Sequence, residues 1–151
     1  MNPIDPTHPA DTGTAGGDHP ETLWIGDPLI DSEHRALLRA LGEITIASDS
    51  DTPAGRRDFY DVLSQFGGAL SDHFAHEEAL MRSIAMPDAA YAAHVQAHEA
   101  IVEQYTVLNL ELMQGRQAPR NNIRQLVRQW ILDHIIHHDL VIRDRLALSR
   151  L

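Results

Sequence analysis

The sequence predicts an all-α protein: an antiparallel four-helix bundle with up-down-up-down topology that follows a flexible N-terminal tail. Three observations predict this fold class. Four segments carry large apolar side chains at steps of three and four residues, which is the spacing of one helix face. Short runs rich in Pro, Gly, Asp and Ser separate these segments, and no stretch alternates apolar and polar residues as a strand does. Helices joined by short connectors pack antiparallel around one shared core.

Residues 1–21 are predicted to form the tail. They are rich in Pro, Gly, Thr and Asp, and Ile4 is their one large apolar residue after Met1, so burial cannot offset the entropy of ordering them. Residues 22–151 suit a single domain. No apolar stretch reaches the roughly 18 residues of a membrane span, and the N-terminus lacks the apolar segment of a signal peptide. We therefore expect a cytoplasmic protein.

The first two predicted helices make up the N-terminal half of the bundle. One follows the Asp27-Pro28 pair, which is typical of a turn, and ends near Ala47. The other lies beyond a polar run from Ser48 to Gly55 and reaches about Ile84. The stripe of the first helix consists of Ile30, His34, Leu37, Leu38, Leu41 and Ile44. The stripe of the second consists of Phe59, Leu63, Phe66, Leu70, His73, Glu77 and Leu80.

The last two predicted helices make up the C-terminal half. The third starts at Met86-Pro87-Asp88 and ends before the run Gly115–Pro119. The fourth takes Asn121 or Asn122 as its cap and runs close to the C-terminus. The stripe of the third helix consists of Tyr91, His94, His98, Ile101, Tyr105, Leu108 and Leu112. The stripe of the fourth consists of Ile123, Val127, Trp130, His134 and Val141.

Composition restricts the function. Twelve basic and 22 acidic residues give a net charge of −10, which repels nucleic acid and anionic membranes, so neither is an expected partner. The chain has no cysteine, and any metal site must therefore use nitrogen and oxygen ligands. The unusual feature is its ten histidines.

Histidine and carboxylate residues interrupt all four apolar stripes. An unpartnered buried polar group costs about 1–3 kcal/mol, so these positions need compensation. Residues four apart share a helix face, and each of the pairs His73/Glu77 and His94/His98 therefore points one way. The other interruptions are His34 on the first helix and, on the fourth, a cluster of His134, His137, His138 and Asp139. One pair arises easily by chance, but interruptions on four stripes together indicate a shared metal site.

The number of donors indicates two metal ions. Five imidazoles and two carboxylates exceed the ligands of one zinc ion, and a mixed nitrogen and oxygen set favours iron over copper, nickel or manganese. The Glu-x-x-His pairs of ferritin-like di-iron proteins do not occur in the sequence. Spacing favours His138, four residues after His134, as the second ligand of the fourth helix. Asp139, five residues after His134, would need a locally widened helix or a carboxylate that reaches across a broad site.

From Trp24 to the C-terminus, these residues resemble the hemerythrin family, in particular the bacterial hemerythrins. The matching elements are Trp24 with Ile30-Asp31-Ser32-Glu33-His34, then His73-Phe74-Ala75-His76-Glu77-Glu78, then His94 with His98, then Trp130, His134 and Asp139. The resemblance implies two non-haem irons, one held by His94, His98 and His134 and the other by His34 and His73. It implies that Glu77, Asp139 and an oxo or hydroxo group bridge the two irons.

The resemblance also implies a function. The second iron keeps an open position, where dioxygen would bind reversibly as hydroperoxide, for storage, delivery or buffering, without enzymatic turnover. Apolar residues beside the ligands would line this oxygen pocket and keep out water and proton donors: Leu37, Phe74, Trp130, Ile131 and Ile135. One alternative is a sensor of oxygen, redox state or nitric oxide that signals to a protein partner. Another is a diiron oxidase or peroxidase, which would need a solvent path and a proton donor near the open iron.

The sequence departs from the family pattern at two positions. Glu33 stands where many bacterial members carry Gln. A carboxylate there could contact a ligand from outside, but we expect Glu33 to face solvent, outside the site. Met86 stands where the family has Tyr before Pro87, which would change packing or access but no ligand. We expect the remaining histidines to be solvated, to lie beside the ligands or to belong to the tail: His8, His19, His76, His137 and His138.

Overall fold

The computed structural model describes residues 23–48, 53–115 and 120–151, which are mostly helical and contain no strand. The all-α prediction is confirmed. The helices are α1 (Pro28–Ser48), α2 (Pro53–Ser83), α3 (Asp88–Met113), α4 (Arg120–His134) and α5 (Leu140–Ser149), with the π-helical turn η2 (Ile135–Asp139) between the last two. The predicted tail, residues 1–21, lies outside the described residues.

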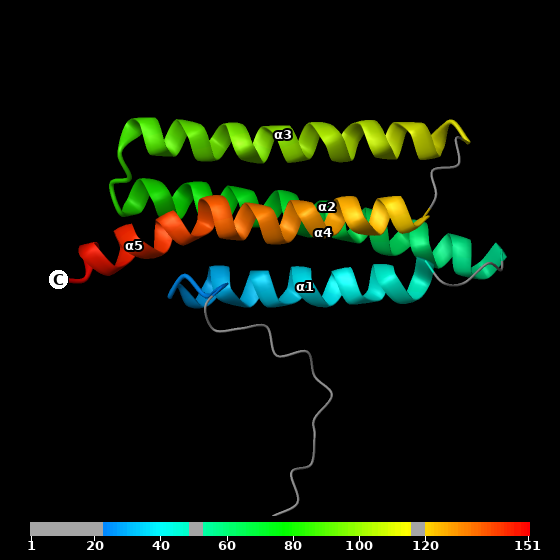
Figure 1. The fold of residues 1–151 in the computed structure, drawn as a ribbon, viewed down its shortest axis with the longest axis horizontal. Helices are drawn as coiled ribbons and strands as arrows, with labels where there is room; N and C mark the ends of the chain where they lie inside the picture. The colour runs from blue at the N-terminus through cyan, green and yellow to red at the C-terminus, as the bar shows by residue number, and fades with distance from the viewer. Residues whose placement is uncertain (1–22, 49–52, 116–119) are drawn as a thin grey trace, which may run out of the picture.

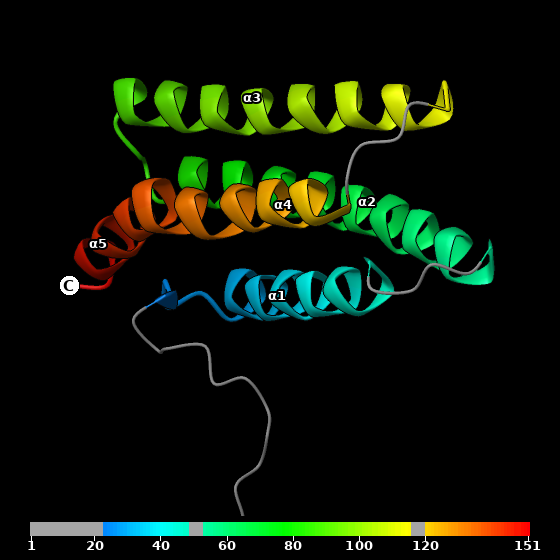
Figure 2. The same cartoon turned by 45° about the vertical axis from the view of Figure 1, so that its right-hand side comes forward.

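The helices α4, η2 and α5 follow one another without a break and together form one long rod. This rod and the helices α1, α2 and α3, each a rod of its own, lie side by side (Figure 1). In both views α1 and α3 lie on opposite sides of the layer formed by α2 and α4 (Figure 2). The colours show that each rod runs in the direction opposite to the one before it. Residues far apart in sequence therefore meet in the interior of the bundle.

Two aspartates fix the start of α1. Asp27 Oδ1 accepts hydrogen bonds of 3.0 Å from two backbone N–H groups of the first turn, and Pro28 occupies the first helical position, where no N–H is needed. Asp31 is buried and accepts hydrogen bonds from the N–H groups of Ile25, at 2.8 Å, and Gly26, at 3.1 Å. Gly26 has a φ of 94°, a conformation that favours glycine. These contacts hold the segment before α1 against the bundle.

Two apolar clusters fill the interior. The larger one comprises 15 buried residues and includes Phe59, Phe66 and Val127. The smaller one lies near the connection between α2 and α3 and consists of Ile25, Ile30, Met81, Met86 and Ile142. On each rod, buried histidines and carboxylates occur at or next to the boundary between the residues of the two clusters. Met86, the departure from the family pattern, is thus a buried packing residue.

Three predicted details of the helices are wrong. The helix α2 begins at Pro53, two residues before the predicted end of the connector at Gly55. The helix α4 begins at Arg120, so neither Asn121 nor Asn122 precedes it as a cap. Val141 is 48% exposed, and its neighbour Ile142 is buried instead. The turn η2 contains one residue more than an α-helical turn needs, and this residue moves the buried stripe along by one position.

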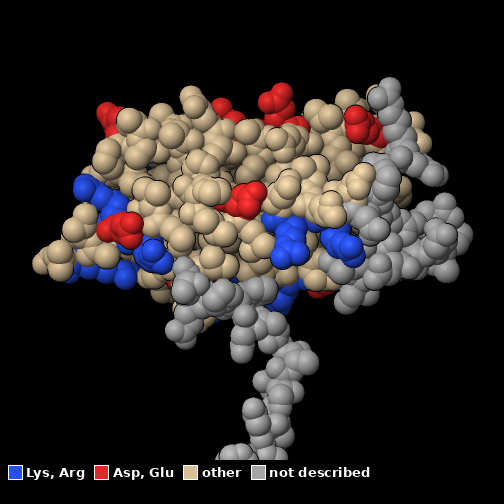
Figure 3. Space-filling model, viewed as in Figure 1, with Lys and Arg blue, Asp and Glu red and all other residues tan. Residues whose placement is uncertain are grey.

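Charged side chains are unevenly distributed on the face shown in Figure 3. Red carboxylate side chains stand along the α3 edge, and the blue side chains lie over α4, α5 and α1, with a few red ones among them. The blue groups are all arginines, because the chain contains no lysine. Among the described helices, none is both long and apolar enough to cross a membrane.

Candidate metal centre

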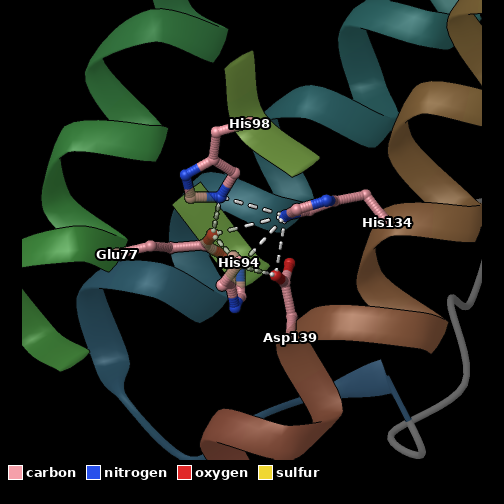
Figure 4. Close-up of side chains that lie close together, drawn as sticks. All are labelled: Glu77, His94, His98, His134 and Asp139. Carbon is pink, nitrogen blue, oxygen red and sulfur yellow. Dashed lines mark hydrogen bonds and ion pairs between the residues drawn. The ribbon is translucent and has the colours of Figure 1, made fainter. Parts of the chain in front are cut away.

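The seven side chains predicted as metal ligands lie together inside the bundle, and each is at most 5% exposed. They are His34 from α1, His73 and Glu77 from α2, His94 and His98 from α3, His134 from the end of α4, and Asp139 from the end of η2. All four rods therefore contribute. Figure 4 shows Glu77, His94, His98, His134 and Asp139 pointing toward one another.

The donor atoms form two overlapping groups, and within each group all atoms lie within 4.8 Å of one another. The five-residue group consists of Glu77, His94, His98, His134 and Asp139. The four-residue group consists of His34, His73, Glu77 and Asp139. This spacing suits donors arranged around one cation, since metal–ligand bonds are about 2.0–2.2 Å. Two cations side by side would share the two carboxylates.

The Glu77 carboxylate presents one oxygen to each group. Its Oε1 lies 2.9 Å from His73 Nε2 and 3.3 Å from His34 Nε2. Its Oε2 lies 2.9 Å from His98 Nε2 and 3.3 Å from His94 Nε2. A carboxylate divided in this way can bridge two cations.

The two oxygens of Asp139 also contact histidines of different groups. Its Oδ2 lies 3.0 Å from His34 Nε2, and its Oδ1 lies 3.0 Å from both His94 Nε2 and His134 Nε2. Both residues therefore direct one oxygen toward the α1 side of the centre and the other toward the α3 and α4 side.

The donor set fits metal cations better than it fits hydrogen bonds alone. The Nε2 atom of His134 lies 3.2 Å from His94 Nε2 and 3.1 Å from His98 Nε2, and only one nitrogen of each pair can donate to the other. Neither oxygen of Asp139 makes a well-oriented hydrogen bond within the described residues. Buried polar atoms are rarely left in this state, and cations would satisfy the nitrogens and the oxygens together.

The pKa values of the buried groups also favour a site for cations. Burial lowers the pKa of His34 and of His134, but close contacts with the carboxylates of Asp139 and Glu77 outweigh it and raise each pKa to about 9. Burial and the charge of Glu77 raise the pKa of Asp139, yet its close contacts with His134, His34 and His94 lower it to about 2. Without a metal, protons on the histidines would have to neutralise the buried carboxylates.

The turn η2 brings Asp139 into the centre. The N–H of Leu140 donates to the carbonyl of Ile135, five residues back, which marks the wider π-helical turn. Asp139 is fully buried as a result, although it follows His134 by five residues. His138 belongs to neither group, and its ring stacks against that of His134 with centroids 5.1 Å apart. The structure thus contains the local widening that the sequence requires for Asp139.

The five predicted oxygen-pocket residues are all buried and belong to the larger apolar cluster: Leu37, Phe74, Trp130, Ile131 and Ile135. The ring of Phe74 stacks on His98 with centroids 3.9 Å apart. Trp130 Nε1–H donates to Gln104 Oε1 at 2.6 Å, so its single polar group is satisfied. These residues extend the apolar interior up to the histidines.

Two further carboxylates contact the centre from outside. The expectation that Glu33 faces solvent is wrong, because its side chain is only 18% exposed and accepts hydrogen bonds from His73 Nδ1 at 3.4 Å and His76 Nδ1 at 2.7 Å. Glu78 accepts a hydrogen bond of 3.0 Å from His98 Nδ1. His76 is 47% exposed and lies in neither group. The only sequence signal for the two glutamates was their position beside His34 and Glu77.

The fold and this site together define a cation-binding four-helix bundle with histidine and carboxylate ligands. A family model described as "Hemerythrin HHE cation binding domain" matches residues 26–143, and the chain belongs to the hemerythrin family. Bacteriohemerythrin from Stenotrophomonas maltophilia (strain R551-3) is 26% identical over 125 residues, which cover 83% of this chain and 78% of that protein. Myohemerythrin from Theromyzon tessulatum is 25% identical over 128 residues, which cover 83% and 90%. No solved structure matches the chain significantly.

Proposed function

We propose that the chain binds two non-haem iron ions at the seven buried residues and that the pair binds dioxygen reversibly. His94, His98 and His134 would hold one iron and His34 and His73 the other. Glu77 and Asp139 would bridge the two irons together with an oxo or hydroxo group. One observation carries the proposal: in Glu77 and in Asp139, one carboxylate oxygen contacts the four-residue group and the other contacts the five-residue group. Mixed imidazole and carboxylate donors suit iron.

The two sides of the centre are unequal. One side offers three imidazoles and the other offers two, which would leave an open position on the second iron. Two ferrous ions, held by these residues, would supply the two electrons that reversible dioxygen binding of the hemerythrin type requires. The chain's own contribution would be an apolar enclosure on this side. Leu37, three residues after His34 on α1, is buried, and the ring of Phe74 lies 5.9 Å from that of His73 between centroids, so both would keep water and proton donors from the bound gas. We infer storage, delivery or buffering of dioxygen, without turnover.

One observation favours the enzymatic alternative as a second candidate. A surface pocket of about 370 Å³ between α3 and the rod of α4 reaches His134, and its lining includes Asp133, His137 and His138. Such groups can relay protons from solvent, which a diiron peroxidase or oxidase needs. The pocket reaches the three-imidazole side, however, and not the side with the proposed open position. Reversible binding therefore remains the better-supported function.

The test is the iron content of anaerobically reduced protein, followed by its visible spectrum as oxygen is admitted and then removed. We expect two irons per chain and a spectral change that reverses under inert gas. Two irons that oxidise irreversibly would contradict reversible binding, and catalytic loss of added peroxide would then favour the enzymatic alternative. One iron or none would contradict the assignment of the seven ligands.

A further inference from the structure

Two of the five buried histidines, His73 and His98, have a carboxylate partner at the ring nitrogen that faces away from the centre. All five imidazoles direct Nε2 into the centre, so Nδ1 is the free ring nitrogen. The Nδ1 of His98 donates to Glu78 at 3.0 Å, and the Nδ1 of His73 donates to Glu33 at 3.4 Å. The Nδ1 atoms of His34 and His134 have no hydrogen-bond partner within the described residues.

Glu33 and Glu78 contact the centre in the same way: each lies beside a predicted ligand of its own helix but contacts a histidine of a neighbouring helix. Glu33 precedes His34 on α1 but contacts His73 on α2, and Glu78 follows Glu77 on α2 but contacts His98 on α3. His73 belongs to the four-residue group and His98 to the five-residue group, so each group receives one such carboxylate. Both glutamates are partly shielded from solvent, with side chains 18% and 26% exposed.

We propose that Glu33 and Glu78 are positioning residues of the metal centre, each orienting one histidine of one group. The inference rests on the proposed function. A carboxylate only accepts hydrogen bonds, so Nδ1 must carry the ring proton, and this leaves the lone pair of Nε2 free for a cation. The negative charge also makes the imidazole a stronger electron donor to the metal.

The two contacts differ in strength. Glu78 is bound to His98 through a short hydrogen bond, whereas Glu33 makes a longer contact with His73. The other oxygen of Glu33 accepts a 2.7 Å hydrogen bond from the exposed His76, which holds the carboxylate between α1 and α2. Loss of Glu78 should therefore affect its iron more strongly than loss of Glu33 affects the other.

The test compares Glu78→Ala, Glu78→Gln, Glu33→Ala and Glu33→Gln with the wild-type chain. The measurements are the rate at which a ferrous chelator removes iron anaerobically and the visible spectrum of the iron-loaded protein. Loss of such a hydrogen bond typically weakens metal binding about 10- to 100-fold, so each alanine variant should release one of its two irons faster by a factor in that range. Glutamine keeps side-chain volume and an acceptor oxygen, and its variants should fall between alanine and wild type.

The matched control is Glu99→Ala, which removes the same charge from an exposed position beside His98 on α3. It should release iron at the wild-type rate with an unchanged spectrum. Wild-type release rates in both alanine variants would overturn this inference alone, because the wild-type chain would still hold two irons. Equal acceleration in Glu99→Ala would also overturn it, since general charge would then explain the effect. A wild-type chain that binds no iron would overturn the proposed function and this inference with it.

Discussion

Glu77 shows how a charged side chain can be fully buried in this bundle. It is 0% exposed, and its carboxylate contacts imidazoles from α1, α2 and α3. Burying an unpaired carboxylate costs several kcal/mol, and these contacts hold the pKa of Glu77 well below its usual value in spite of burial. The residue is therefore bound to the whole cluster, and its removal should affect both metal positions.

Substitution Glu77→Ala should reduce the iron content from two per chain to nearly none, because both irons would share this carboxylate. By contrast, His138→Ala should keep both irons, since His138 belongs to neither group. Metal analysis after anaerobic desalting measures both. Two retained irons in Glu77→Ala would refute the bridging assignment, and one lost iron in His138→Ala would make His138 a ligand.

Residue patterns allowed prediction of the buried cluster but not of its surroundings. The seven residues could be found because a histidine or carboxylate on an apolar stripe is visible in the sequence itself. Glu33 and Glu78 lie off the stripes, and their partners come from other helices. Such contacts depend on how neighbouring helices are rotated against each other, which one-dimensional periodicity does not contain.

At the scale of elements, η2 determines the register of the last rod. After the buried neighbours His134 and Ile135, the next buried positions are Asp139, then Ile142 and Leu146 at steps of three and four. The predicted stripe continued the α-helical period through this region and therefore assigned Val141 to the core. A single inserted residue leaves no local composition signal, and only the buried pattern on both sides reveals it.

Deletion of Ile136 should leave the fold and both irons in place. Ile136 is 49% exposed, and its removal places Asp139 four residues after His134, so an ordinary α-helical turn can present both side chains on one face. The comparison is deletion of the exposed Arg128 in α4, which should rotate everything after it by about 100° and abolish iron binding. Iron content and thermal unfolding check both. Loss of iron on deletion of Ile136 would show that the π-helical turn itself is required.

The packing of α2 against α3 depends on a glycine. The Tyr105 hydroxyl donates to the Leu63 carbonyl at 3.0 Å, and a Cβ on Gly67 would collide with the Tyr105 ring. Substitution Gly67→Ala should lower the free energy of unfolding by about 1–2 kcal/mol, because repacking and the lost hydrogen bond outweigh the gain in helix propensity. Gly68→Ala meets nothing within 4 Å and should raise it by up to about 1 kcal/mol. Denaturant unfolding measures both, and equal effects would contradict the role of Gly67.

At the scale of the whole molecule, the buried histidines and carboxylates of the metal centre form a polar layer. This layer lies between two apolar clusters that each span several helices. The stripes predicted the helical bundle and the polar interruptions of its core, because long amphipathic helices with short connectors have few ways to bury their apolar faces. They did not predict the division of the core into two clusters. The stability of the bundle should nevertheless depend on whether protons or metal ions are bound in this polar layer. Buried histidines and carboxylates favour folding only when protons or metal ions balance their charges.

The metal-free and iron-loaded proteins should therefore differ in how their stability depends on pH. In the metal-free protein the pKa of His34 and of His134 is raised from 6.5 to about 9, so the stability they contribute is complete below pH 6.5 and is lost as the pH rises through about 9. Asp139, with a pKa lowered to about 2, contributes stability above its ordinary value of 3.8 and loses it only in strong acid. Iron needs deprotonated imidazoles, so the stabilisation that iron provides should grow over the same rise from pH 6.5 to 9. Thermal unfolding of chelator-treated and iron-loaded protein should show a Tm that falls over this range in the former and a widening gap between the two. A metal-free Tm that rises from pH 6.5 to 9 would contradict the proton-balanced cluster.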